Sequence, residues 1–141
     1  MSAEKNKALT RRFYEEIFSK GNFVIADELI DTNCIDHNPL IPGQATGLEG
    51  AKQVYTMIRT AFPDLRVTIE DQVAEGDKVV SRLTMRGTHR GRFMGIAPTD
   101  NVGEAEIIDI VRFDNKKIVE RWGILDQIKM MRQLGVSPPA K

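Results

Sequence analysis

Asp126 is the carboxylate best placed for proton transfer, because it stands where a predicted strand gives way to a predicted helix. It continues the side of the strand that carries Trp122 and Ile124, and Ile128 follows it. Apolar neighbours withdraw a carboxylate from water, which raises its pKa and suits it to general acid/base catalysis. An aspartate at such a junction is also a common helix N-cap. Position alone leaves both roles open and favours the cap.

The two histidines are further candidates for proton transfer or polar recognition. His37 lies in a turn-prone Asp-His-Asn-Pro run that could form the rim of a pocket or an exposed turn. The ordinary pKa of histidine, about 6.5, suits proton transfer at neutral pH. His89 lies in a glycine-rich segment with Arg86 and Arg90, which could recognise an anionic or carbonyl group. A solvated loop is the simpler interpretation of that segment.

Four more side chains could line a pocket. Arg112 and Glu120 could orient a carbonyl substrate, although a structural ion pair explains them equally well. Tyr55 and Trp122 could shape an apolar wall, although aromatic residues at such spacings usually belong to the core.

The elements that must position these residues begin with helices. An apolar residue at every fourth position over Leu9–Ile17 predicts a helix that ends at Gly21. Asn22 can cap a second, shorter helix, and a third is predicted over residues 47–62. Between the second and third helices, Cys34–Pro42 is predicted to be extended or turning.

After Pro63 the apolar period changes from about 3.6 to 2, which indicates a meander of strands. Gly76-Asp77 predicts a two-residue turn, and counting outward from it places Asp71 opposite Arg82. That arginine could serve the pocket or form a structural ion pair. The strands end in a short helix near residues 127–134.

The second hairpin is predicted to turn through a three-residue loop, Asp114–Lys116. This loop length sets which side chains share a face. It places Asp109 opposite Arg121 on the outer face, and Arg112 with Trp122 on the pocket face.

Composition limits the classes of function. The chain has 141 residues, enough for one domain, and Lys+Arg 20 balances Asp+Glu 20. This balance argues against nucleic acid and anionic membranes as partners. No apolar run approaches the roughly 20 residues of a membrane span and no signal peptide is evident, so we expect a cytoplasmic protein. A single cysteine, Cys34, and two histidines argue against a metal site.

Several segments, in this order and spacing, resemble one family. They are Ala74–Arg82, Gly87–Gly95 with Pro98-Thr99, Arg112-Phe113 with Ile118–Trp122, and Asp126 with Gln133–Gly135. Over about residues 5–136 the chain resembles the SnoaL-like polyketide cyclase (ester cyclase) family of the nuclear-transport-factor-two-like superfamily. The resemblance implies an α+β cone-shaped barrel of three N-terminal helices packed on a strongly curved, mostly antiparallel sheet. Residues 1–136 would form this domain and 137–141 a short tail.

The resemblance also implies a site and an assembly. Asp126 would match the aspartate that acts as general acid/base in an intramolecular aldol ring closure, without metal or other cofactor. Arg112 stands where the aromatic cyclases have a histidine, so the assisting group would differ. We expect a homodimer through the outer sheet face, on which Ile107, Val111, Val119 and Leu125 are predicted to lie.

The predicted function is therefore cofactor-free acid/base catalysis that removes a proton beside a carbonyl of a small apolar substrate. Asp126, His37 and Arg112 are its predicted catalytic residues, and Trp122 with Tyr55 would shape the wall. Two alternatives remain. The pocket could bind an apolar metabolite without catalysis, because a fold does not fix a function. It could also hydrolyse or hydrate a small electrophile.

Overall fold

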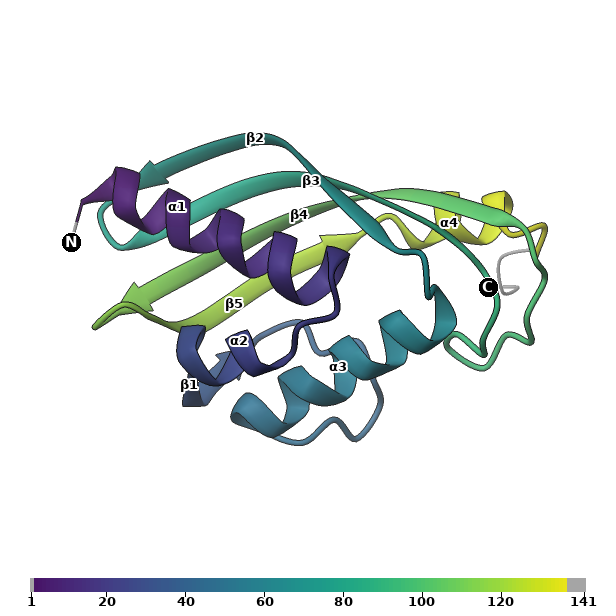
Figure 1. Ribbon diagram of the computed structural model, residues 1–141, viewed down its shortest axis with the longest axis horizontal. Coiled ribbons are helices and arrows are strands. Elements are labelled where there is room, and N and C mark those ends of the chain that lie inside the picture. The colour runs from purple at the N-terminus through teal and green to yellow at the C-terminus, as the bar shows by residue number, and fades with distance from the viewer. Residues whose placement is uncertain (1, 137–141) are drawn as a thin grey trace.

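The computed structural model describes residues 2–136, so the predicted tail at 137–141 lies outside the described residues. In chain order the elements are α1 (Ala3–Phe13), the π-helical turn η1 (Tyr14–Ser19), α2 (Val24–Leu29), β1 (Ile30–Asp36), α3 (Gly47–Ala61), β2 (Arg66–Glu75), β3 (Lys78–Thr88), β4 (Val102–Asp114), β5 (Lys117–Leu125) and α4 (Gln127–Gln133). The α+β class predicted from the sequence is confirmed (Figure 1).

The five strands form one sheet in the order β1-β5-β4-β3-β2. β1 runs parallel to β5, and the other neighbouring pairs are antiparallel. α1 crosses β2 and β3, α3 lies against β1, and α4 packs on the first residues of β4 (Figure 1). We call the sheet face covered by these helices the inner face and the opposite one the outer face.

The first predicted helix is α1 continued by η1. The Ser2 hydroxyl accepts a hydrogen bond from the Lys5 backbone N–H at 3.1 Å and so caps the start of α1. In η1 the helix widens to a π-helical turn, and this turn buries both Tyr14 and Ile17. The segment ends at Gly21, whose φ of +70° is the predicted left-handed stop.

The second predicted helix exists but starts differently from the prediction. Phe23 occupies the N-cap position of α2, and no side chain caps the helix. Asn22, the predicted cap, instead donates its side-chain N–H to Glu16. β1 directly follows α2 and was not predicted as a strand, because Asp31-Thr32-Asn33 in its middle has the composition of a turn.

The first hairpin matches its prediction. Glu75 pairs with Lys78 across the Gly76-Asp77 turn, and Asp71 pairs with Arg82. The Arg82 Nε lies 2.8 Å from Asp71 Oδ2. A two-residue turn with glycine first is a strong signal, which explains why the register could be counted from the sequence.

The predicted register of the second hairpin is wrong. The turn has two residues, Asn115 and Lys116, with φ of +51° and +66°, and Asp114 pairs with Lys117. Both turn residues have the positive φ of a type I′ turn, which lysine rarely adopts, so the sequence concealed the turn type. A bulge then adds one residue to β5, and Arg112 pairs with Glu120.

The bulge offsets the shorter turn, so Arg112 and Trp122 do share a face, as predicted. That face is the outer one, because the opposite residues of β4, such as Val111 and Phe113, are buried beneath the helices. The assignment of this face to the pocket is therefore wrong. The error arose because the true inner face carries Asp109 and Arg121, whose charges made it look like the solvent side.

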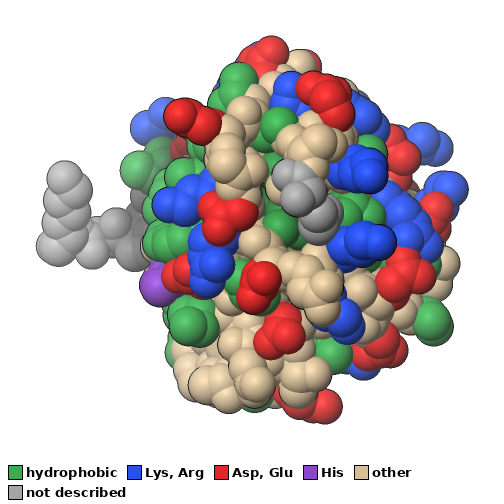
Figure 2. Space-filling model, turned by 90° about the vertical axis from the view of Figure 1, so that its left-hand side faces the viewer, with side chains coloured by type: hydrophobic (Ala, Val, Ile, Leu, Met, Phe, Trp, Pro, Cys, Tyr) green, Lys and Arg blue, Asp and Glu red, His purple; other side chains and the backbone are tan. Residues whose placement is uncertain are grey.

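The surface carries charges of both signs. Figure 2 shows one end of the molecule, where Lys and Arg side chains are interspersed with Asp and Glu. This face offers no continuous basic area, in keeping with the balanced composition.

Candidate functional site

A cavity of about 910 Å³ lies between the inner face of the sheet and the helices. Its walls are largely apolar, with Phe18, Tyr55, Phe62 and Phe93 among the lining residues. The rings of Phe18 and Tyr55 meet edge to face, with centroids 5.0 Å apart. A cavity of this size and lining is typical of sites for small organic molecules.

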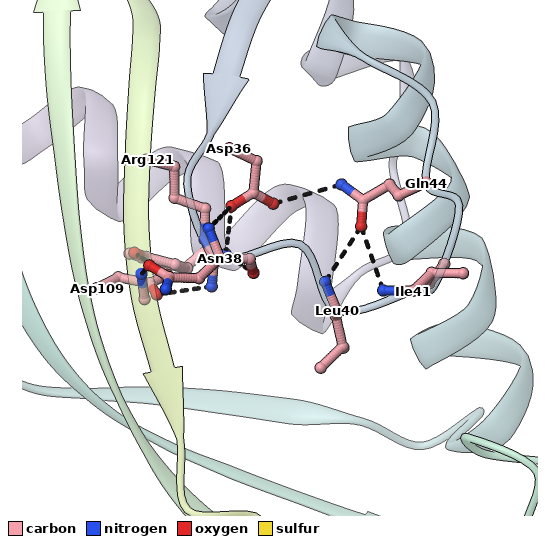
Figure 3. Close-up of polar contacts among 9 residues, drawn as sticks. Asp36, Asn38, Leu40, Ile41, Gln44, Asp109 and Arg121 are labelled. Atoms are coloured by element: carbon pink, nitrogen blue, oxygen red, sulfur yellow. Dashed lines mark hydrogen bonds and ion pairs between the residues drawn. The ribbon is translucent and has the colours of Figure 1, made fainter.

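The polar part of the cavity wall centres on Arg121. Its Nη1 lies 3.0 Å from Asp36 Oδ1, and its Nη2 lies 2.9 Å from Asp109 Oδ1 (Figure 3). All three residues line the cavity. The strand order explains the arrangement, because β5, which carries the arginine, lies between β1 and β4.

Asp109 is a buried carboxyl in this cluster, with 5% of the residue exposed. The Tyr14 hydroxyl donates a hydrogen bond to its Oδ2 at 2.9 Å. Burial raises the pKa of Asp109, and this effect outweighs the lowering by Arg121 and Tyr14. Burial also raises the pKa of Tyr14, so the tyrosine remains a neutral donor.

The segment after β1 is tied to the same cluster. The Gln44 side-chain N–H donates to Asp36 Oδ2 at 3.4 Å (Figure 3). Its carbonyl oxygen accepts from the backbone N–H of Leu40 at 3.2 Å and of Ile41 at 3.4 Å. Asn38 accepts from the Gly123 backbone N–H at 3.0 Å. These bonds hold the segment against β5 at the cavity.

Gly123 leaves the space that the Asp109–Arg121 pair occupies. It is the register partner of Asp109, whereas Arg121 pairs with Val111 and reaches Asp109 diagonally. A Cβ on Gly123 would lie 2.0 Å from Asp109 Oδ1 and 2.3 Å from Arg121 Nη2. Any side chain here would therefore displace the ion pair.

The chain matches known proteins over most of its length. A model of the SnoaL-like polyketide cyclase family matches residues 8–134. The chain belongs to this family. It is also similar to nogalonic acid methyl ester cyclase from Streptomyces nogalater, with 29% identity over 119 residues that cover 84% of this chain and 89% of that protein.

Solved structures of other proteins share the fold of this SnoaL-like protein. TsrD from Streptomyces laurentii has a TM-score of 0.87 and 25% identity, covering 96% of this chain and 98% of its own. IdmH from Streptomyces antibioticus, a candidate polyketide cyclase, has a TM-score of 0.80 and 33% identity, covering 93% of this chain and 99% of its own.

Two of the predicted site residues line the cavity of this SnoaL-like protein. Tyr55 forms part of its aromatic wall. Asp126 also lines it but is an exposed residue, and its Oδ1 accepts from the Lys129 backbone N–H at 3.1 Å as the N-cap of α4. The cap suggested by its position is thus present, and its predicted catalytic role stays a prediction.

Four other predicted residues form one cluster outside the cavity lining. His37 Nε2 lies 2.8 Å from Glu120 Oε2, and Glu120 Oε1 lies 2.5 Å from Arg112 Nε. The His37 ring stacks on Trp122 with centroids 4.7 Å apart. His37 and Arg112 lower the pKa of Glu120, which keeps it ionised. Arg112, Glu120 and Trp122 lie on the outer sheet face, so the predicted pocket position of this group is wrong.

The remaining two predicted residues also lie apart from the cavity lining. Arg82 is exposed and pairs with Asp71 on the outer face. His89 is fully buried, which contradicts the solvated loop expected there. Its ring stacks on Phe62 at 5.4 Å, and its Nδ1 lies 3.1 Å from Thr99 Oγ1. Backbone hydrogen bonds join His89 to Asp100 and Asn101, so the two ends of the loop meet next to the histidine.

The sequence interpretation missed Asp36 and Tyr14, and it placed Asp109 and Arg121 on the wrong face. A usable signal was present, because Asp109 and Arg121 were predicted to be in contact. The glycine at 123 in an otherwise bulky strand marked the point where a neighbouring side chain needs room. Asp36 could not be found this way, because its position depends on the parallel pairing of β1 with β5.

Two further observations concern metals and membranes. Within residues 2–136, no three side chains of His, Cys, Asp or Glu lie close enough together to hold a metal ion. No helix in the same part of the chain combines the length and apolar character needed to cross a bilayer.

Proposed function

We propose that this SnoaL-like protein is an acid/base enzyme that acts on a small apolar carbonyl compound in the cavity, without a cofactor. The reaction would remove a proton from a carbon beside a carbonyl and close a ring within the same molecule. Family membership and the similarity to a nogalonic acid methyl ester cyclase support this chemistry.

The observation that carries the proposal is the buried carboxyl of Asp109 in a largely apolar cavity. Its raised pKa brings its ionisation closer to neutral pH, where a group can both accept and return a proton. Arg121 lies against the same wall, and its positive charge would stabilise negative charge on a substrate oxygen.

The proposed steps conserve all atoms. The Asp109 carboxylate accepts the proton from the carbon, and the electron pair of the broken C–H bond forms an enolate. The enolate carbon attacks a second carbonyl of the same molecule, which forms a C–C bond and an alkoxide. The protonated Asp109 then returns its proton to the alkoxide. The aromatic wall would hold the two reacting ends together and exclude water.

Asp126, the residue predicted from the sequence, remains the second candidate for the acid/base role. It lines the cavity, but it is exposed and its Oδ1 serves the α4 cap. Asp109 is buried beside Arg121, so we favour Asp109.

The test offers nogalonic acid methyl ester to the wild type and to two matched variants, Asp109→Asn and Asp126→Asn. Chromatography with mass spectrometry follows the product, because aldol ring closure leaves the mass unchanged. We expect Asp109→Asn to lower turnover about 100-fold or more while the ligand still binds. Asp126→Asn should keep most activity, because asparagine serves nearly as well in the cap.

Each other outcome has a defined meaning. Loss of turnover only in Asp126→Asn would move the acid/base role to Asp126 and leave the reaction class standing. A product heavier by one water would replace ring closure with hydration or hydrolysis. Tight binding of this and related carbonyl compounds without turnover would favour a non-catalytic binding protein.

We also propose that the protein forms a homodimer through the outer sheet face. Large apolar side chains remain exposed there, including Ile108 and Ile124, which pair across β4 and β5.

A further inference from the structure

One guanidinium serves two carboxylates at the cavity wall. Within residues 2–136, Arg121 is the one cation that bonds to either Asp36 or Asp109. When both carboxylates are ionised, the cluster carries one negative charge without a partner. In an apolar cavity a charge without a partner is energetically costly. The strength of the interaction of Arg121 with each acid therefore affects the ionisation of that acid.

The two carboxylates differ in the hydrogen-bond donors around them and in their exposure to water. Asp36 also accepts from the Asn38 backbone N–H at 3.0 Å and from Gln44, and 23% of its side chain is exposed. Among the described residues, only Arg121 and Tyr14 donate to Asp109, and 7% of the Asp109 side chain is exposed. The charge that lacks a partner therefore falls on Asp109.

We propose that Asp36 is a positioning residue. It binds one guanidinium nitrogen of Arg121, which weakens the interaction of Arg121 with Asp109 and so keeps Asp109 able to exchange a proton in the cavity. Its importance for catalysis rests on the proposed function, whereas its effect on Asp109 does not. Without Asp36, Arg121 would interact with Asp109 alone and would hold it as a weakly basic anion.

The groups that face Asp109 come from every element packed around it. η1 contributes Tyr14, α3 contributes Tyr55, β5 contributes Arg121 and β1 contributes Asp36. β3 contributes the uncharged Ser81 as the register partner. Burial and the charge of Asp36 raise the pKa of Asp109, while Arg121 and Tyr14 lower it. Removing Asp36 or Tyr14 should therefore shift the ionisation of Asp109 in opposite directions.

The experiment measures the ionisation of Asp109 directly by carbon-13 NMR of its side-chain carboxyl in the ligand-free protein. Its signal is assigned by its absence in Asp109→Asn. We expect the wild-type midpoint to lie above the ordinary aspartate value of about 3.9. Asp36→Asn should lower the midpoint by about one pH unit, and Tyr14→Phe should raise it. Asp36→Glu keeps the charge and should stay close to the wild type.

Three results would overturn the proposal. The first is a wild-type midpoint below the ordinary aspartate value, which needs no variant and means that Asp109 already has the full charge of Arg121. The second is an unchanged or raised midpoint in folded Asp36→Asn. The third is an equal shift in Asp36→Glu and Asp36→Asn, which would mark a structural effect without charge.

A kinetic measurement separates this proposal from the proposed function. If the protein turns over a carbonyl substrate, the acid limb of its pH–rate profile should move with the NMR midpoint in Asp36→Asn. If no carbonyl substrate is turned over, the proposed function fails while the NMR result still decides the role of Asp36.

Discussion

Asp109 and Asp126 illustrate how much the surroundings of a carboxyl decide its chemistry. Both line the same cavity. Asp126 is exposed to water at the start of a helix, whereas Asp109 lies beneath η1 with a tyrosine and an arginine as partners. The general argument made from the sequence, that a carboxyl among apolar neighbours has a raised pKa, describes Asp109.

The raised pKa of Asp109 predicts a pH dependence of stability. Because its pKa is higher in the folded protein than in the unfolded chain, its contribution to stability is full below the unfolded-state pKa. The contribution is lost as pH rises through the folded-state pKa. Asp109→Asn removes this loss, so the stability of the variant relative to the wild type should improve as pH rises.

Urea unfolding of both proteins at a series of pH values measures this difference. Two curves of unfolding free energy that stay parallel across the acid and neutral range would contradict the prediction. The slope of each unfolding transition serves as the control, because it reports whether the variant unfolds through the same change in exposed surface.

At the scale of elements, the Arg121 ion pairs depend on close contact of β4 and β5 at Gly123. Gly123→Ala should lower the free energy of unfolding by about 1–3 kcal/mol, because the added Cβ overlaps the Asp109–Arg121 pair. Chemical denaturation measures the loss.

A double-mutant cycle provides the control for this prediction. The same substitution in an Asp109→Ala background should cost less, because the carboxylate that meets the new Cβ is gone. An equal cost in both backgrounds would mean that overlap with the Asp109 carboxylate is not what makes alanine unfavourable at this position.

The two hairpins explain how far the sequence alone could predict the elements. Gly76 indicates a tight turn, and the register of β2 and β3 was predicted correctly from it. At Asn115-Lys116 no glycine is present, and the bulge at β5 leaves no mark in the sequence. The residues of β4 were correctly divided between two faces, but the inner and outer faces were exchanged. The sequence does not reveal that Asp109 is buried together with the residues that it bonds to.

At the scale of the whole molecule, the outer sheet face carries large apolar side chains that are exposed. Ile108 and Ile124 are 52% and 66% exposed and are neighbours in the sheet. We expect light scattering at micromolar concentration to give the mass of a dimer, and Ile108→Lys with Ile124→Lys to give that of a monomer. A wild-type monomer would rule out the proposed assembly.

Val24→Lys is the matched control for this prediction. Val24 is 74% exposed, more than either isoleucine, but it lies on α2, away from the outer sheet face. The control variant should therefore remain dimeric. The residues first expected at this interface included Val111, which is only 1% exposed and belongs to the core. The exchanged faces of β4 account for that error.

The parallel pairing of β1 with β5 also sets the order in which the molecule can assemble. Asp36 and Arg121 lie 85 residues apart along the chain, and contacts so distant in sequence form slowly. During synthesis, α1, α2, α3, β1 and β4 all leave the ribosome before β5 does. Until then the two acidic groups have no cation between them. The cavity cannot be completed until β5 and α4 have been made, because both carry residues that line it, so a bound ligand would mark chains that have reached this stage.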